Sequence, residues 1–443
     1  MALAFAEPTR PPNTRLGGKP DGGKLGGGKL GGKSWALLAF VLVQVLSVTL
    51  LQKFGLPVGG DVMEIAVFTS WIGVGLLALN GMIGLDPVRL LLFCAFAVTA
   101  ISSQLLGGQP FSVNSVFLAL ALYAPFVLRF YVEPALYRRC MDIFLNVMLV
   151  AGGLVVLQQL MQLTVGWRAW PDLDKLAPQQ FLFSGYNYLQ PVAFGSPWEK
   201  PNAFLFLEVS FVSQFTAIAL MIELALRQRL LRMVFYAVVL LISFAGTGLL
   251  LLAVCAPLVL TKLSPRMLIT LGLLVLVAAI VAGAIGWYDQ VSHRFGEIGT
   301  AGSSGYYRFN VPFQIVGDMA GDPRFMFTGH GAGSTGAGQS QNVAGFILVP
   351  FAKIIYEYGF LTFFAFYAFL IYCLFAEAPS LLIAFALFMF FNLGGGGFVV
   401  PVYVVTCQVL GALLRVQPER RPDPARRRFR RGRPEPGAVQ ASA

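Results

Sequence analysis

Long apolar runs, separated by short polar connectors, fill the chain from residue 35 to residue 414. A helix needs about 20 apolar residues to cross a bilayer, and several of these runs approach that length. The pattern therefore predicts an all-α polytopic membrane protein with about 12 transmembrane helices. Their expected ranges are Trp35–Leu51, Val62–Leu85, Val88–Leu106, Ser115–Tyr131, Cys140–Val165, Phe204–Leu226, Leu231–Phe244, Gly248–Thr261, Met267–Trp287, Phe346–Phe375, Leu381–Leu393 and Phe398–Leu414.

Composition and charge support this class and define three parts of the chain. Of the 443 residues, 57% are hydrophobic and 12% charged, whereas a soluble domain carries about 25% charged residues. This composition excludes an ordinary soluble enzyme and a nucleic-acid-binding module. Two basic, low-complexity tails, 1–34 and 416–443, are expected to be disordered, and they flank a transmembrane domain at 35–415. The tails either only fix the topology or also bind anionic lipid or a partner protein.

The distribution of charge predicts the orientation. The net charge of +11 resides almost entirely in residues 1–34 and in the segment from Arg415 onward. Both termini are therefore expected in the cytoplasm, which requires an even number of spans. Arg89 and the other connector arginines agree with this orientation, whereas Lys53 is an exception. Two large loops, 166–202 and 288–345, then face the periplasm and are where chemistry is expected.

Several candidate residues lie in or near these loops. Basic side chains at Lys200, Arg294, Arg308 and Arg324 suit phosphate binding. No carboxylate cluster or His/Cys spacing for a metal ion is visible, and the five cysteines suggest no disulfide framework. A Ser-His-Asp set from Ser334, His330 and Asp322 can be assembled on paper, but nothing in the spacing selects it. Arg294 and Arg324 have a second interpretation, as ion-pair partners of loop carboxylates.

Polar residues and glycines within the apolar segments also have competing interpretations. Glu208 and Lys353 are expected near the outer ends of their helices, where they would line one cavity. Glu223 is expected to form an ion pair at the membrane surface. The break at 243–248 either lines a polar cavity or is a hairpin turn in which glycines adopt positive φ. The turn 329–334 is either an anion cradle or a plain loop turn.

Three motifs in a fixed order resemble a known superfamily. They are Lys200-Pro-Asn-Ala-Phe-Leu-Phe-Leu-Glu208-Val-Ser-Phe-Val-Ser-Gln214, the break at 243–248, and Tyr307-Arg308 followed by Gly329-His-Gly-Ala-Gly-Ser334. Together they resemble the O-antigen polymerase and O-antigen ligase superfamily of bacterial glycan assembly, over roughly Gly166 to Gly359. The resemblance implies a C-type membrane glycosyltransferase fold in the bacterial inner membrane. It also implies a metal-independent reaction, without a cofactor, on an oligosaccharide linked to undecaprenyl diphosphate.

The same resemblance implies roles for individual residues. Arg308, assisted by Arg294, Arg324 or Lys200, would hold the diphosphate, although Lys200 stands where an arginine is usual and lacks its planar fork. Glu208 or His330 would orient or deprotonate the acceptor, and His330 has a second interpretation as a hinge of its turn. The remaining substrate-binding positions implied by the motifs are Tyr307, Gly329 and Gly331.

One departure favours a polymerase over a ligase. Superfamily ligases typically carry a His-Asn pair before a Glu-x-Gly motif, whereas here Val349 stands at the aligned position ahead of Glu357-Tyr-Gly359. The expected function is polymerisation of repeat units into exopolysaccharide or O-antigen. The expected partners are membrane lipids, a chain-length regulator and a flippase. Nucleic acid is not expected to bind. A glycan ligase, a transporter of lipid-linked glycan and a non-catalytic export scaffold remain the alternatives.

Overall fold

The computed structural model describes residues 31–58, 61–166, 172–183, 186, 188–192, 196, 198–284, 306, 309–335, 348–395 and 397–417. This part of the chain is mostly helical, which confirms the expected fold class at that level. The helices are α1 (Gly32–Thr49), α2 (Ile65–Leu79), α3 (Pro87–Gly107), α4 (Val113–Tyr123), α5 (Pro134–Thr164), α6 (Leu173–Leu176), α7 (Val209–Leu226), α8 (Leu230–Ile242), α9 (Gly246–Leu260), α10 (Pro265–Ala284), α13 (Val311–Gly321), α14 (Pro323–Thr328), α15 (Pro350–Phe375), α16 (Leu381–Leu393) and α17 (Pro401–Cys407). Shorter helical turns are η1 (Ala124–Val127), η3 (Gln179–Phe181) and the π-helical η5 (Gln408–Ala412).

In the described part of the chain, five helices are long and apolar enough to cross a membrane, namely α1, α3, α5, α7 and α15. Shorter apolar helices lie in the bundle beside them, among them α2, α8, α9 and α16. Every range expected to span the membrane contains helix in the described part of the chain. The presence of several membrane helices is thus confirmed, while the number of crossings stays a prediction.

Short strands, which the sequence analysis did not predict, join several helix ends. β1 (Gly55–Val58) and β2 (Asp61–Glu64) form an antiparallel hairpin between α1 and α2. β3 (Gly84–Leu85), β4 (Leu128–Val132) and β5 (Leu414–Val416) form a second sheet, in which β4 pairs with β5 in parallel. We call the end of the bundle with this second sheet the sheet end. The opposite end, where residues 172–208 and α14 lie, is the loop end.

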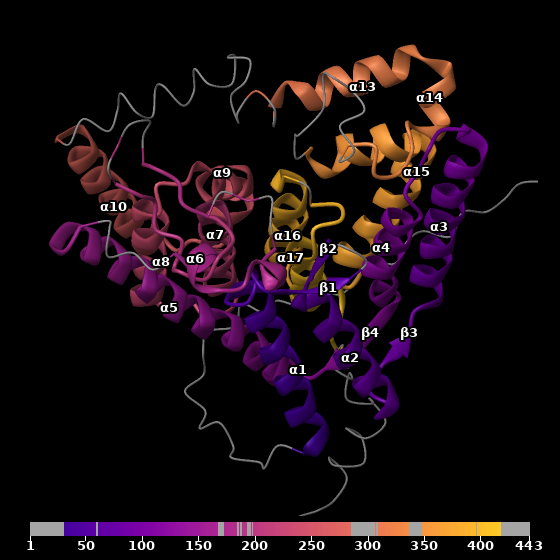
Figure 1. The fold of residues 1–443 in the computed structure, drawn as a ribbon. Helices are drawn as coiled ribbons and strands as arrows, with labels where there is room; N and C mark the ends of the chain where they lie inside the picture. Colours follow the sequence, from indigo (N-terminus) through magenta and orange to yellow (C-terminus); the bar gives the residue numbers. More distant parts are fainter. Residues whose placement is uncertain are drawn as a thin grey trace, which may run out of the picture.

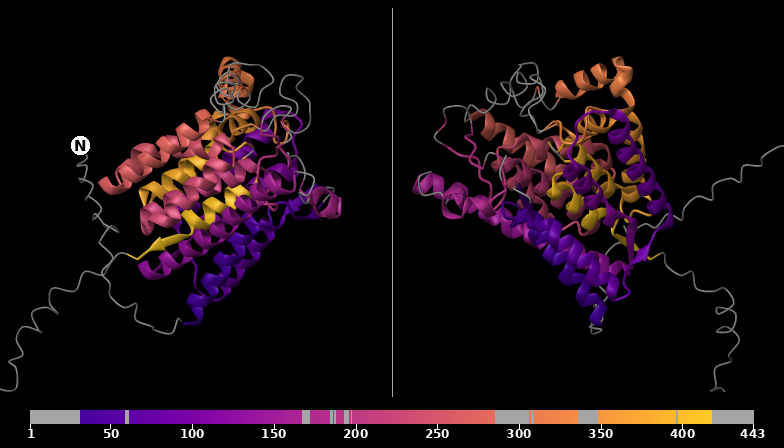
Figure 2. Two further views of the ribbon diagram at one scale, coloured as in Figure 1. Left: turned by 90° about the vertical axis from the view of Figure 1, so that its left-hand side faces the viewer. Right: turned by 45° about the vertical axis from the view of Figure 1, so that its right-hand side comes forward.

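The bundle surrounds α7, while α13 lies across the loop end (Figure 1). α7 packs against α5, α8, α9 and α16, and 89% of its residues are buried inside the protein. A helix covered by protein on all sides belongs to the centre of a bundle. In the left view of Figure 2, the bundle helices run side by side in a common direction. α7 therefore carries its first residues to the middle of the loop end.

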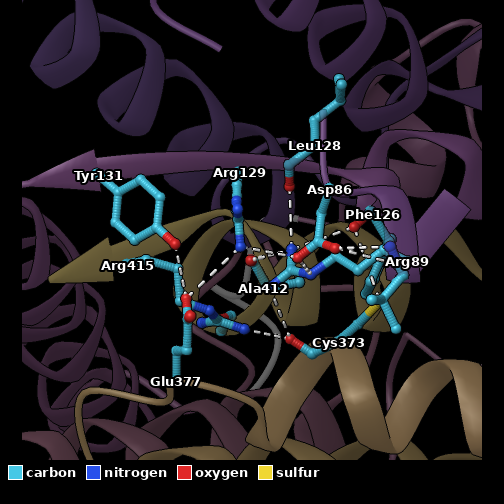
Figure 3. Close-up of polar contacts among 12 residues, drawn as sticks. Asp86, Arg89, Phe126, Leu128, Arg129, Tyr131, Cys373, Glu377, Ala412 and Arg415 are labelled. Atoms are coloured by element: carbon cyan, nitrogen blue, oxygen red, sulfur yellow. Dashed lines mark hydrogen bonds and ion pairs between the residues drawn. The ribbon is translucent and has the colours of Figure 1, made fainter. Parts of the chain in front are cut away.

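Two buried arginines hold the sheet end together (Figure 3). The Arg89 side chain, from α3, donates hydrogen bonds to the carbonyls of Phe126, Leu128 and Ala412 at 2.8–3.2 Å. Arg415, from β5, donates to the carbonyls of Gly411, Leu414 and Cys373. Most of these carbonyls lie at helix ends, where the backbone lacks partners within the helix. The guanidinium groups thus satisfy acceptors from three separate segments, 126–128, 411–414 and the end of α15.

Both residues have a structural role besides their charge. Arg415 was assigned to the charge of the C-terminal tail and Arg89 to the connector charges that fix topology. Both are also buried, with exposed fractions of 0% and 1%. Burial, reinforced by repulsion from Arg89, lowers the pKa of Arg415 to about 10, so it remains protonated at neutral pH. Asp86 supplies a nearby negative charge, 3.0 Å from the Nη1 atom of Arg129 and 3.6 Å from the Nε atom of Arg89.

Other expectations about this scaffold can now be resolved. Glu223 forms the expected ion pair, with its Oε2 atom 2.7 Å from the Nη2 atom of Arg229. All five cysteines are free. The region 288–345, expected to be a loop, contains α13 and α14. α13 forms because Val311, Ile315 and Met319 repeat at helical spacing and pack against α15.

Candidate functional site

The described residues between 182 and 202, in the first large loop, fold back onto the β1–β2 hairpin and α7. The Phe183 amide donates to the carbonyl of Lys53 at 2.8 Å, and Phe54 forms an isolated bridge with Leu182. This contact buries Lys53, which is 3% exposed. Its ammonium lies 3.8 Å from the ring centroid of Tyr188, a cation–π contact. The exception to the charge rule at Lys53 is therefore a residue enclosed at the loop end.

Asn202 organises the segment that follows. Its side chain donates to the carbonyl of Tyr188 at 3.0 Å, accepts from Gln158 at 3.0 Å, and accepts from the Phe204 amide at 3.1 Å. Ala203 and Phe204 both adopt positive φ, at 56° and 61°. Such a conformation costs about 1–3 kcal/mol for each residue and persists only where the surroundings impose it. Two strained residues in succession mark this segment as a candidate functional site.

The strain also explains why α7 begins later than expected. The predicted helix starts at Phe204, whereas the observed helix starts at Val209 and Glu208 occupies its N-cap position. The carboxylate of Glu208 accepts from the Ser210 hydroxyl and, at 3.3 Å, from Gln190. Glu208 is therefore a half-buried acid at the mouth of the central helix. It lies outside the helical segment in which it was predicted.

The Ser243–Gly248 break packs directly against the start of α7. Ser213 donates to the carbonyl of Ala245 at 3.0 Å and accepts from the Gly248 amide at 3.1 Å. The hairpin-turn interpretation was wrong about the glycines, because φ is positive at Phe244 and not at Gly246 or Gly248. Gly248 is needed for space, since a Cβ there would lie 2.3 Å from the Ser213 carbonyl oxygen. Two motifs distant in sequence thus meet at one place.

A second polar cluster forms where α15 is interrupted. Gly359 has a φ of 80°, so the range expected as one continuous helix is broken there. The carbonyl of Tyr356 accepts from the His330 amide at 2.8 Å. The carbonyl of Glu357 accepts from the Gly331 amide and from the Gln104 side chain, each at 3.2 Å. The turn 329–334 therefore supplies the hydrogen bonds that the broken helix lacks.

The same contacts show how the turn packs. The amide groups of His330 and Gly331 donate to α15, and the amide of Ala332 donates to Gln104 at 2.7 Å. These three groups are therefore already paired. Gly329 and Gly331, both with positive φ, let the turn approach α15 and the Pro110 carbonyl. A role of the turn in binding substrate stays a prediction.

Lys353 and Glu357 form a buried pair beside this turn. The Lys353 ammonium lies 3.2 Å from the Glu357 carboxylate and donates to the Thr335 hydroxyl at 2.8 Å. Thr335 in turn donates to Glu357 at 2.5 Å. The shared cavity expected for Lys353 and Glu208 is not seen in the described contacts, which place the two residues in separate clusters. Glu357 is 1% exposed, so its negative charge depends on Lys353.

His330 lies between two aromatic rings. Its imidazole stacks on Phe325 with a centroid separation of 4.0 Å and on Tyr356 at 4.4 Å. Burial lowers its pKa below the ordinary value of 6.5, although the Tyr356 carbonyl and Asp322 act in the opposite direction. The ring is therefore neutral at pH 7. Its Nδ1 atom is buried and lacks a hydrogen-bond partner among the described residues.

Of the remaining predicted site residues, Arg324 is among the described residues. Arg324 lies on α14 and is exposed. Asp322 caps that helix by accepting from the Arg324 amide at 2.9 Å, and within the described part the two side chains form no ion pair. Arg294, Tyr307 and Arg308 lie outside the described residues. Among the described residues, no three His, Cys, Asp or Glu side chains are grouped to hold a metal ion.

Several site residues were missed by the sequence analysis. They are mostly amides inside apolar runs. Gln52 accepts from the Leu207 amide at 3.2 Å, while Gln158 and Gln104 tie the loop segments to α5 and α3. A polar side chain within a predicted span is a signal of function or of a cavity, and this signal was available for Gln104 and Gln158. Lys53 was noticed only for its charge.

Comparison with known proteins gives one finding. The family model for WcaD colanic acid polymerase matches residues 39–335, about two thirds of the chain. The matched range begins within α1 and ends with Thr335, so it includes Lys53, the Asn202 segment and the turn at 329–334. No curated protein matches the chain.

Proposed function

Because the chain belongs to the WcaD colanic acid polymerase family, we propose that it lengthens a polysaccharide at the loop end of its bundle by joining repeat units carried on undecaprenyl diphosphate. Family membership carries this proposal. The structure supports it through the cluster at the start of α7, where buried cations, a half-buried acid and strained backbone converge. The polymer made by this chain need not be the one after which the family is named.

The charges at the loop end suit a lipid diphosphate. Lys53 and Lys200 are 3% and 6% exposed, and both lie beside the 188–190 segment, where Lys200 donates its amide to the Gln190 carbonyl at 2.7 Å. A cation in such a water-poor site acts on an anion more strongly than it does in water. We assign Lys200 and Lys53 to the donor diphosphate, together with Arg308, Arg294 and Arg324.

The proposed reaction exchanges one carbon–oxygen bond for another. The acceptor hydroxyl oxygen bonds to the anomeric carbon of the donor sugar, and the bond from that carbon to the diphosphate breaks. The departing undecaprenyl diphosphate gains negative charge, which the cations stabilise most in the transition state. Glu208 or His330 takes the acceptor proton. His330 is suited to this role because it is neutral at pH 7.

The proposed orientation places the loop end in the periplasm of a bacterium and both tails in the cytoplasm, with about 12 crossings of the inner membrane. The arginines at the sheet end, Arg89, Arg129 and Arg229, agree with the excess of positive charge expected on the cytoplasmic side. A chain-length regulator and a flippase remain the proposed protein partners. Single cysteines at Lys175 and Arg232 test the orientation: a membrane-impermeant maleimide applied from the periplasm should label the first alone.

Reconstitution tests the reaction. The purified protein in liposomes should convert lipid-diphosphate repeat units into a ladder of longer lipid-linked chains. Arg308→Ala, Lys200→Ala and Lys53→Ala should each reduce the yield by about tenfold or more, whereas Lys175→Ala should not, since Lys175 is exposed and only pairs with Asp172. Glycan on a different acceptor would indicate a ligase. Transport of the substrate without new bonds would contradict the proposal.

A further inference from the structure

Residues 190–192 and 198–200 pair in antiparallel as the two arms of a hairpin, and the second arm carries Trp198. Pro191 and Glu199 form an antiparallel bridge, and the Val192 amide donates to the Trp198 carbonyl at 2.8 Å. The Trp198 side chain is 39% exposed and lies beside a polar cluster. The backbone at Trp198 and Glu199 is nevertheless held in place by the pairing with residues 191 and 192.

Gln162 fastens this hairpin to α5. Its side-chain oxygen accepts from the Glu199 amide at 2.8 Å, and its side-chain nitrogen donates to the Glu199 carbonyl at 2.8 Å. The amide thus pairs with the backbone of Glu199 as a neighbouring strand would. Gln162 is itself 1% exposed, so the clamp is shielded from competing water. Trp198 and Glu199 therefore hold fixed positions relative to the bundle.

The carboxyl group of Glu199 has unused hydrogen-bonding capacity. Its Oε2 atom is buried and has no hydrogen-bond partner among the described residues. A buried acceptor without a partner is rare in proteins and points to a missing ligand or water. Burial raises the pKa of Glu199, while the neighbouring Lys200 opposes this effect. The group can therefore accept or share protons with hydroxyl groups that approach it.

The position of Gln162 along α5 indicates which part of a membrane-bound substrate would approach Glu199. The charged first turns of α5 end at Asp142, and the stretch from Ile143 to Thr164 is about 33 Å long, close to the thickness of the hydrocarbon core. Gln162 therefore lies at the membrane boundary. The sugars of a lipid-linked oligosaccharide begin at that level, directly beyond the diphosphate.

We infer that Trp198 and Glu199 form a glycan subsite that holds a pyranose ring of the lipid-linked oligosaccharide. The indole face packs on the C–H face of the ring, and Glu199 accepts hydrogen bonds from ring hydroxyls. Two residues of extended chain span about 6.6 Å, roughly one pyranose, so the subsite lies one sugar away from a diphosphate held near Lys200. This inference rests on the proposed function for the identity of the lipid-linked substrate.

Steady-state kinetics with lipid-linked repeat units test the subsite. Trp198→Ala should raise KM by about tenfold with kcat changed by less than about twofold, because the ring contact is made equally in the ground and transition states. Trp198→Tyr should stay near the wild-type value, since it keeps an aromatic face. Glu199→Gln should raise KM several-fold. The control is Trp35→Ala, which removes another exposed tryptophan, 61% exposed, at the start of α1.

A second measurement separates this inference from the proposed function. The oligosaccharide released from its lipid by mild acid should quench tryptophan fluorescence of the wild-type protein, and Trp198→Phe should abolish that change. Quenching without polymerisation would support the subsite and contradict the polymerase. An unchanged KM in Trp198→Ala, with or without a lower thermal stability, would overturn the subsite and leave Trp198 as an anchor in the lipid headgroups.

Discussion

Gly329 lies against the backbone at Glu357, just before Gly359, and Gly359 lies against the backbone at Phe327, just before Gly329. A Cβ on Gly329 would lie 2.4 Å from the carbonyl carbon of Glu357, and a Cβ on Gly359 would lie 2.5 Å from that of Phe327. Both residues also have positive φ, which disfavours any side chain. The turn after α14 and the break in α15 therefore require each other. Their contact sets the position of His330 and of the Lys353–Glu357 pair.

Substituting either glycine should disrupt this contact. We expect Gly359→Ala and Gly329→Ala each to destabilise the protein by at least about 1–3 kcal/mol, because the new methyl group meets backbone atoms in an unfavourable conformation. Thermal unfolding in detergent measures the effect. Gly317→Ala in α13 is the matched control, since no atom lies within 4 Å of a Cβ at that position. Equal melting temperatures for Gly359→Ala and the control would show that the backbone contact is not made.

The Lys353–Glu357 pair should behave as a coupled unit. Lys353→Met leaves a carboxylate that is 1% exposed without its cation, so we expect a loss of about 3–5 kcal/mol. The double variant Lys353→Met with Glu357→Gln should recover much of that loss, because it removes both charges. A double-mutant cycle on unfolding free energies measures the coupling. Additive effects of the two single changes would argue against a direct interaction.

The pKa of His330 predicts a pH dependence of stability. The folded-state pKa lies below the ordinary value of 6.5 because burial disfavours the imidazolium. The unfolded chain therefore binds a proton that the folded protein does not, and stability should fall as the pH drops below about 6.5. His330→Gln should remove this part of the dependence. Unfolding followed from pH 5 to pH 8 measures it, and an identical profile for the variant would contradict the assignment.

The same residue allows a test of catalysis. If His330 accepts the acceptor proton, the acid limb of the polymerisation rate should lie below pH 6.5, and His330→Gln should lower kcat by about 100-fold. If the ring only packs between Phe325 and Tyr356, His330→Phe should retain nearly full activity. Rates measured from pH 5 to pH 8 distinguish the two roles.

The buried arginines of the sheet end should be necessary for folding. Arg89→Leu removes the guanidinium donor from the carbonyls of Phe126, Leu128 and Ala412, and each buried acceptor left unpaired costs about 1–3 kcal/mol. We expect little folded protein, measured as the monodisperse fraction in size-exclusion chromatography. Arg232→Leu is the control, because its contact with Asn146 is exposed. Equal folded yields would exclude a supporting role for Arg89.

Hydropathy was sufficient to predict the helices because burial in lipid demands long apolar runs. The ends of the helices were harder to predict, since helix termini depend on contacts distant in sequence. Phe204 was expected inside a helix, yet the Asn202 side chain holds its amide and delays the helix to Val209. Likewise, α15 was expected to continue through Gly359, whose break depends on the turn near Gly329. A local hydropathy pattern does not reveal such contacts between distant segments of the chain.

The candidate site was predictable in part. The motif from Lys200 to Glu208 and the break at 243–248 were singled out in sequence, and the structure brings both to the start of α7. Lys53 was not recognised, because a single lysine beside an apolar run resembles an ordinary connector. Its burial depends on Tyr188, which lies more than a hundred residues later in the chain. Arg294, Tyr307 and Arg308 lie outside the described residues, so their roles stay predictions.

The parallel pairing of β4 with β5 has a consequence for biosynthesis. β5 is the last strand in the described chain, yet Arg415 on it completes the hydrogen bonding at the end of α15 and lies beside Arg89 of α3. Contacts across so many residues form slowly. Most of the helices will have entered the membrane before this strand emerges from the ribosome. Ribosome stalling or premature termination ahead of Leu414 should therefore yield an inserted but open bundle, which a membrane protease can recognise and degrade.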